Sequence, residues 1–132
     1  MKIEHLGIAV KSLENSDHLF ERLLGKSSYK KETVEREGVT TSFYEIGESK
    51  IELLEASKDD SPIAKFIEKK GEGIHHIAFG VDDIYAEIDR LKKEGFVFIS
   101  EEPKDGADNK IVVFLHPKST NGILVELCQE KK

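Results

Sequence analysis

The sequence predicts an α+β fold built from two successive βαβββ modules. Three observations support this prediction: strand and helix patterns recur in the same order in both halves of the chain, a short motif is repeated between the halves, and one helical segment separates them. We expect the 132 residues to form a single domain, with module one at about 1–56, a connector helix at about 57–73 and module two at about 74–132.

The first module is predicted to begin with a strand at residues 2–10. Its apolar residues are compatible with a strand, and no helical pattern of apolar residues fits around Gly7. A helix follows, which we expect Asn15 or Ser16 to cap and Gly25 to end, because a polar cap and a terminal glycine are typical helix boundaries. Short apolar runs between turn residues then predict three strands, at 29–36, 39–47 and 50–55.

The connector is predicted to form a helix that Ser61 caps, with Pro62 at the first helical position, where proline is favoured. The second module then repeats the order of the first, with a strand at 74–81 and a helix that Asp82 or Asp83 caps. Its three remaining strands are expected at 96–100, 111–115 and 123–127.

The repeat is also visible residue by residue. His5 opens the motif His-Leu-Gly-Ile-Ala-Val, and His76 opens His-Ile-Ala-Phe-Gly-Val 71 residues later. Glu52 within Ile-Glu-Leu likewise matches Glu126 within Val-Glu-Leu. Because side chains alternate along a strand, each His shares its face with small residues and each Glu points away from the apolar residues beside it. We expect the two faces with small residues to be open enough to line a cavity.

A convergence of these two imidazoles and two carboxylates would suit a divalent transition metal such as Co²⁺, Zn²⁺, Ni²⁺ or Mn²⁺, with coordination left for water or substrate. The alternative is that each His is an ordinary strand residue with a satisfied hydrogen bond and each Glu lies on a solvated face. The recurrence of the pair at matching positions favours a metal site made of His5, Glu52, His76 and Glu126.

A donor-rich loop at 116–122 leads into the strand that carries Glu126. Its residues His116, Lys118 and Ser119 are candidates for contacts with an anionic substrate, although a solvated hairpin explains Lys118 equally well. Lys104 and Lys110 are further candidates for phosphate contacts, with solvated loop lysines as the alternative. Two further histidines are expected to lie outside the site, His75 on the opposite face and His18 on the first helix. Cys128 alternates in phase with Glu126 and is expected to be a buried or half-buried thiol and not a nucleophile.

The composition of the chain limits the classes of molecule that it can bind. The chain has 20 Lys and Arg against 26 Asp and Glu, a net charge of −6, which argues against binding to nucleic acid or to an anionic membrane. A single cysteine excludes an intrachain disulfide and a cysteine-based zinc cluster. The longest apolar runs are strand-sized and no apolar signal region opens the chain, so we expect a cytoplasmic protein.

Over its whole length the chain resembles the vicinal oxygen chelate superfamily, which includes glyoxalases, bleomycin-resistance proteins and dioxygenases. Several segments are similar to the methylmalonyl-CoA epimerase branch, most specifically the His-Pro-Lys-Ser loop and the following Gly-Ile-Leu-Val-Glu-Leu; the others lie at 5–10, 60–66, 73–79 and 101–103. The resemblance implies that the modules pair into a cup-shaped mixed β-sheet around a divalent metal held by His5, Glu52, His76 and Glu126. By analogy with the fold it also implies a homodimer.

The implied reaction interconverts (R)- and (S)-methylmalonyl-CoA by proton transfer through a metal-stabilised enolate, with an acyl-CoA as the substrate. Glu126 is the first candidate for an acid/base. The second base is open between Glu52, Glu45 and a water on the metal, because Thr, Thr and Ser at 40–42 stand where some relatives carry an acid.

Three other functions stay open at this point. Glyoxalase I (lactoylglutathione lyase), which acts on a glutathione hemithioacetal, needs the same four ligands. A dioxygenase could use two His and one carboxylate to bind Fe(II). A metal-free binding module of the same fold would use only the shape of the cup. The sequence leaves the native metal, the CoA-contacting residues and the oligomeric state open.

Overall fold

A computed structural model describes residues 1–132. The chain forms two compact units: a first unit of residues 5–75, and a second unit of residues 1–4 together with 76–132. The elements follow the order βαβββ, then a helix, then βαβββ again, so the predicted α+β class with two modules is confirmed. None of the three α-helices, which have 9 to 12 residues, is long and apolar enough to cross a membrane.

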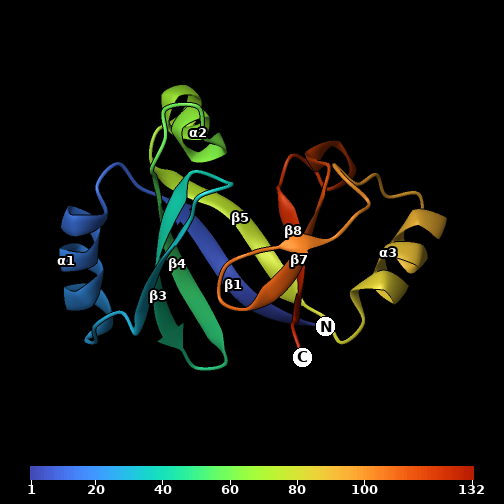
Figure 1. Cartoon of the computed structure of the whole chain (residues 1–132), viewed down its shortest axis with the longest axis horizontal. Coiled ribbons are helices and arrows are strands. Elements are labelled where there is room, and N and C mark those ends of the chain that lie inside the picture. The colour runs from blue at the N-terminus through green and yellow to red at the C-terminus, as the bar shows by residue number, and fades with distance from the viewer. The chain divides into compact units, whose positions relative to one another are not determined.

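The first unit contains the first module and the connector helix. Its elements are β1 (Lys2–Ala9, of which residues 5–9 belong to this unit), α1 (Leu13–Leu24), β2 (Lys30–Val34), β3 (Val39–Ile46), β4 (Ser49–Ala56) and α2 (Pro62–Lys70). The strand order is β2-β3-β4-β1, with β1 parallel to β4 and the other neighbours antiparallel. Helix α1 packs against β3 and β4, and α2 packs against β4 (Figure 1).

Helix α1 begins earlier than the sequence predicts, because Ser12 and not Asn15 or Ser16 is its cap. The Asn15 N–H donates to Ser12 Oγ at 3.2 Å, and the Leu13 N–H donates to the carboxylate of Glu55 on β4. This earlier start places Leu13 in the apolar cluster beneath the helix, where only 7% of the residue is exposed. The predicted boundaries Gly25, Ser61 and Pro62 are confirmed.

Both faces of the first unit's sheet are covered by apolar side chains. The cluster beneath α1 consists of Val10, Leu13, Tyr44 and Leu53. On the other face, α2 covers Ala9, Val39, Leu54 and Ile63. At Ala9 the face that carries His5 is therefore covered and not open, since Ala9 is fully buried by the side chains that pack around it.

The second unit contains the second module. Its elements are β5 (Gly73–Gly80, of which residues 76–80 belong to this unit), α3 (Ile84–Lys93), β6 (Lys104–Asp105), β7 (Lys110–Leu115), a 3₁₀ turn η1 (Pro117–Ser119) and β8 (Val125–Glu130). The strand order is β5-β8-β7-β6, with β5 parallel to β8 and the other pairs antiparallel. Asp83, one of the two expected residues, caps α3.

Two predicted strands of this unit need correction. Residues 96–100 form only an isolated bridge between Phe98 and Leu115, because the Val97 N–H turns to the hydroxyl of Ser119 and pairing does not continue. The last strand begins at Val125 and not at Ile123, whose N–H bonds to the carbonyl of Thr120 and closes a turn.

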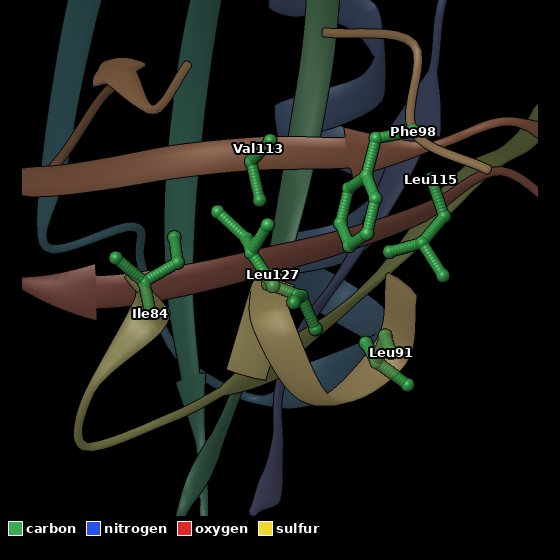
Figure 2. Close-up of a cluster of buried hydrophobic side chains, with 7 residues drawn as sticks. Ile84, Leu91, Phe98, Val113, Leu115 and Leu127 are labelled. Atoms are coloured by element: carbon green, nitrogen blue, oxygen red, sulfur yellow. The ribbon is translucent and has the colours of Figure 1, made fainter. Parts of the chain in front are cut away.

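The main apolar cluster of the second unit lies between α3 and the strands β7 and β8. Figure 2 shows Ile84 and Leu91 of the helix close to the strand residues. The full set of buried residues is Ile84, Ile88, Leu91, Phe98, Val113, Leu115 and Leu127. This cluster occupies one face of the strands, so the alternate residues of β7 and β8, including Glu126, lie on the other face.

Candidate active site

The first unit carries one pair of candidate ligands, His5 on β1 and Glu52 on β4. These strands are parallel neighbours in which Gly7 is the Cα partner of Glu52, so His5 lies two residues before that position on the same face. His5 Nδ1 is 3.1 Å from Glu52 Oε2. Only 4% of His5 and 6% of Glu52 are exposed, so the alternative that this Glu lies on a solvated face is wrong.

The second unit carries the matching pair, His76 on β5 and Glu126 on β8. Ala78 is the Cα partner of Glu126 across parallel strands, which is the same arrangement as in the first unit. His76 Nε2 is 3.2 Å from Glu126 Oε1, and 6% and 5% of the two residues are exposed. As in the first unit, the small neighbour Ala78 is fully buried, so this face is not open beside it either.

The donor set in each unit fits a divalent metal ion. A buried carboxylate needs a positive partner, which an adjacent imidazole supplies when protonated and a metal ion supplies when bound. Imidazole nitrogen and carboxylate oxygen are ligands that Zn²⁺, Co²⁺, Ni²⁺ and Mn²⁺ accept. Each pair is also fixed on two hydrogen-bonded strands, so its ligand atoms are held in place before any ion binds.

Two phenylalanines that the sequence analysis did not single out lie beside these pairs. Phe43 on β3 is the Cα partner of Glu52, and Phe114 on β7 is the Cα partner of Glu126. Directly opposed residues of antiparallel strands share a face, so each ring starts next to a candidate carboxylate. The two rings lie 71 residues apart in the sequence, the same spacing as the two histidines, and this spacing was the signal that could have found them.

The two rings differ in their surroundings. Phe43 is fully buried, with the ring of Tyr29 at 5.9 Å between centroids and Lys30 Nζ at 5.6 Å from its centroid. Phe114 is only partly buried and meets the ring of His76 edge-on, at 5.9 Å between centroids and 85° between planes.

The predicted substrate loop is held by its own hydrogen bonds. His116 Nδ1 accepts from the N–H of Lys118 at 3.1 Å, which caps the short turn η1. Ser119 Oγ accepts from the N–H of Val97 at 2.9 Å. His116 and Lys118 are exposed, so their side chains are accessible to a ligand from solvent.

Other candidates from the sequence occupy different surroundings. Glu45 is exposed near the end of β3, and Ser42 donates its hydroxyl to Asp17 on α1 at 2.7 Å. Lys110 is buried beside Glu130, with 3.6 Å between Nζ and Oε1, so it is not a solvated loop lysine, whereas Lys104 is exposed.

The remaining His and Cys residues behave as expected. His75 packs edge-on against Phe66 of α2, with 5.0 Å between ring centroids, and His18 lies on α1. Cys128 is a buried free thiol whose Sγ lies 3.6 Å from the carbonyl of Phe79, which confirms the prediction of a buried thiol.

A polar cluster between α1 and β3 contains two groups of the first unit whose pKa values are shifted, Asp17 and Tyr44. Asp17 accepts hydrogen bonds from Ser42 and from Tyr44, and Lys31 Nζ lies 3.0 Å from its second oxygen. Burial raises the pKa of Asp17, but these three partners outweigh burial and hold the pKa below its usual value. Burial and the Asp17 carboxylate both raise the pKa of Tyr44. A cavity of about 700 Å³ adjoins this cluster, lined by Glu14, Asn15, Asp17, His18, Glu21 and Lys31.

Comparison with known proteins assigns the family. Residues 4–114 match the model of the glyoxalase/bleomycin resistance protein/dioxygenase superfamily. The chain belongs to this superfamily. It is 45% identical to the ethylmalonyl-CoA/methylmalonyl-CoA epimerase of Cereibacter sphaeroides over 97% of both chains. It is 42% identical to the mitochondrial methylmalonyl-CoA epimerase of Homo sapiens, over 97% of this chain and 73% of the human protein. Within the superfamily it therefore belongs to the epimerase branch.

Solved structures show the same fold. A variant of the Streptomyces coelicolor methylmalonyl-CoA epimerase, in complex with 2-nitronate-propionyl-CoA, matches with a TM-score of 0.94 at 33% identity, over 98% of this chain and 94% of the other. A more distant member of the superfamily, a probable lactoylglutathione lyase of Vibrio cholerae, is 30% identical over 99% of this chain and 92% of the lyase. The similarity to epimerases is thus higher in identity than the similarity to this lyase.

Proposed function

We propose that this chain is a metal-dependent epimerase that interconverts (R)- and (S)-methylmalonyl-CoA. The observation that carries the proposal is the buried His–Glu pair at matching positions of both modules, in a chain that is 45% identical to a named epimerase over nearly its whole length. In this proposal His5, Glu52, His76 and Glu126 together hold one divalent ion, of which Co²⁺, Zn²⁺, Ni²⁺ and Mn²⁺ suit the ligands. The ion would stabilise the negative charge that develops on the thioester oxygen when the neighbouring carbon loses its proton.

The two carboxylates are proposed to move the proton. Epimerisation needs removal of a proton on one side of the carbon and return of a proton on the other, which two acid/base groups accomplish directly. Glu126 is the first candidate and Glu52 the second, because both are buried and each lies beside an imidazole that fixes the orientation of its carboxylate. Burial also keeps bulk water away from the proton while it is transferred.

The loop at 116–119 is proposed to bind the acyl-CoA. His116 and Lys118 are exposed donors, and Ser119 ties the loop to Val97. A cationic lysine suits the phosphates of CoA in a protein whose net charge is −6. We also propose that the protein is cytoplasmic, that it forms a homodimer as its fold suggests, and that 1–132 acts as a single domain.

A second candidate function is that of a lactoylglutathione lyase, which the 30% identity to the Vibrio cholerae protein supports. Both reactions remove a proton from a carbon next to a carbonyl, that of a thioester in one case and of a ketone beside the hemithioacetal carbon in the other, so the same ligands and carboxylates would serve. A third reading is a binding module without metal. These alternatives differ in substrate and metal content, so an assay with two substrates, together with a measurement of bound metal, separates them.

The test is proton exchange in heavy water. Metal-loaded protein is incubated with methylmalonyl-CoA of one configuration, and both deuterium uptake and appearance of the other epimer are followed. We expect uptake with epimerisation, lost in Glu126→Gln and after chelation, but kept in the control Glu130→Gln, whose carboxylate is exposed on the same strand. No uptake by folded, metal-loaded protein would overturn the proposal. Turnover of the glutathione hemithioacetal instead would assign the lyase, and a protein purified without chelator that contains no metal would favour the binding module.

A further inference from the structure

Phe114 lies in the middle of a lateral row of side chains on one face of the second unit. Ile99, Phe114 and Glu126 occupy neighbouring positions, because the Ile99 N–H donates to the Phe114 carbonyl at 2.9 Å and Phe114 is the Cα partner of Glu126. The Phe98–Leu115 bridge fixes the register of this pairing and points Phe98 and Leu115 to the α3 cluster. Ile99 and Phe114 therefore share the face that carries Glu126.

This row changes from polar and buried to apolar and exposed over a short distance. Glu126 is 5% exposed, Phe114 is partly buried, and Ile99 is 57% exposed. Val97, two residues before Ile99 on the same face, is 42% exposed. The segment thus presents an apolar surface that leads from solvent to the candidate acid/base, and Phe114 is the part of that surface closest to the carboxylate.

The equivalent ring in the first unit does not offer such a surface. Phe43 stands opposite Glu52 in the same way, but it is fully buried, with Tyr29 and Lys30 packed against it. Of the two phenylalanines that neighbour a candidate carboxylate, only Phe114 has surface left for a ligand to contact.

We propose that Phe114, supported by Ile99, contacts the alkyl branch of the substrate and determines how large that branch can be. The inference rests on the proposed function. The carbon whose proton Glu126 would remove also bears the branch, so the branch lies within a few bond lengths of that carboxylate. An apolar group there is stabilised by an apolar neighbour, and Phe114 supplies one because directly opposed side chains start only about 5 Å apart.

The experiment compares substrates that differ by one methylene. Metal-loaded wild type, Phe114→Leu and the matched control Phe43→Leu are assayed with methylmalonyl-CoA and ethylmalonyl-CoA. Since one methylene in an apolar pocket changes kcat/KM by about tenfold or more, we expect Phe114→Leu to raise the ethyl-to-methyl ratio of kcat/KM by about tenfold. Phe43→Leu should keep the ratio within about twofold of wild type, whatever it does to stability, because its ring is covered by neighbours.

A binding measurement gives a readout that does not depend on turnover. Propionyl-CoA and butyryl-CoA differ by the same methylene and cannot be epimerised, so calorimetry gives the ratio of their Kd values directly. Phe114→Leu should shift this ratio towards butyryl-CoA, and Ile99→Ala, a change at an exposed position, should shift it in the same direction by a smaller factor.

The outcomes are distinguishable. If the wild type epimerises methylmalonyl-CoA but neither ratio moves in Phe114→Leu or in Ile99→Ala, the inference about Phe114 is overturned and the proposed function stands. If the wild type epimerises neither substrate, the proposed function fails, and the Kd ratio alone decides whether Phe114 contacts an acyl chain. A shift of equal size in Phe43→Leu would also contradict the inference.

Discussion

The Ile84 N–H donates to the side-chain oxygen of Gln129 at 2.7 Å, and this bond joins the first residue of α3 to β8. The first module contains the same connection, since the Leu13 N–H at the start of α1 donates to Glu55 on β4. Gln129 and Glu55 each stand three residues after the Glu of the candidate pair. In both modules, therefore, the strand that carries a candidate carboxylate also holds the beginning of the helix on the opposite face.

Removal of this connection should destabilise the fold. We expect Gln129→Ala to lower the free energy of unfolding by about 1 kcal/mol, because the Ile84 N–H loses its acceptor. Gln129→Glu should retain the stability, since Glu55 already performs this function in the first module and a carboxylate is favourable at a helix N-terminus. Urea unfolding checks both variants, with the exposed Glu102→Ala as a control. Equal losses of unfolding free energy in the Ala and Glu variants would show that the hydrogen bond from the Ile84 N–H to the side chain of residue 129 does not account for the stability.

Metal stoichiometry tests whether the two pairs act together. If His5 and Glu52 join His76 and Glu126 around one ion, the wild type should bind one ion per chain after dialysis, measured by mass spectrometry of the metal. His5→Ala and His76→Ala should then each reduce the metal bound to well below half an ion per chain. Chelation should lower the Tm of the wild type only. Two ions per chain, or one ion retained at full affinity in either variant, would mean that each pair binds separately.

Asp17 should make stability depend on pH. Its pKa is lowered in the folded state from the ordinary value of 3.8, so its contribution to stability is present above that value and is lost as the pH falls through the folded pKa. We expect Asp17→Asn to cost about 1–3 kcal/mol at pH 7, because a buried network with Ser42 and Tyr44 loses its charge. Urea unfolding of both proteins at pH 7 and pH 3.5 should show the difference shrinking at the lower pH. A difference that is constant between the two pH values, or one shared by the exposed Asp59→Asn, would contradict this role.

Lys118 should affect binding but not folding. Its side chain is exposed, so Lys118→Ala should leave the Tm unchanged within the error of the measurement. If the ammonium group contacts a phosphate of CoA, the KM should rise severalfold at low salt, and the increase should diminish above about 0.3 M salt, where exposed charges are screened. A KM that is the same in variant and wild type at low salt would leave the loop's binding role to His116 and Ser119.

The sequence predicts the two modules and the pairing of His with Glu because both follow from local patterns. Strand alternation and the 71-residue repeat are enough to put His5 and His76 at equivalent places, and the structure pairs each with the predicted Glu. What the sequence does not predict is the burial of the carboxylates. Glu52 alternates with Ile51 and Leu53, which locally suggests a solvated face, but Phe43 from the neighbouring strand and Leu54 beneath α2 occupy that face as well.

The boundaries that the sequence missed depend on distant partners. Ser12 is the cap of α1 because burial of Leu13 and the bond from Leu13 to Glu55, 42 residues away, favour the earlier start. Residues 96–100 have the composition of a strand, but the Val97 N–H is taken by Ser119, so only the bridge at Phe98 remains. Tertiary packing decides whether such a backbone N–H pairs with a neighbouring strand or with a side-chain acceptor, and the hydrophobic pattern of the sequence does not reveal the choice.

The way the chain divides into units determines which fragments of it can fold. Residues 1–4 belong to the compact unit formed by residues 76–132, and the side chain of Glu4 lies against Gly80, which has no Cβ to occupy that space. A fragment that starts after the connector helix would therefore lack residues 1–4, which precede the first module in the sequence but belong to this unit. Co-expression of 1–72 with 73–132 should yield more folded 73–132 fragment than co-expression of 5–72 with 73–132, because residues 1–4 complete a unit whose other residues follow about seventy positions later.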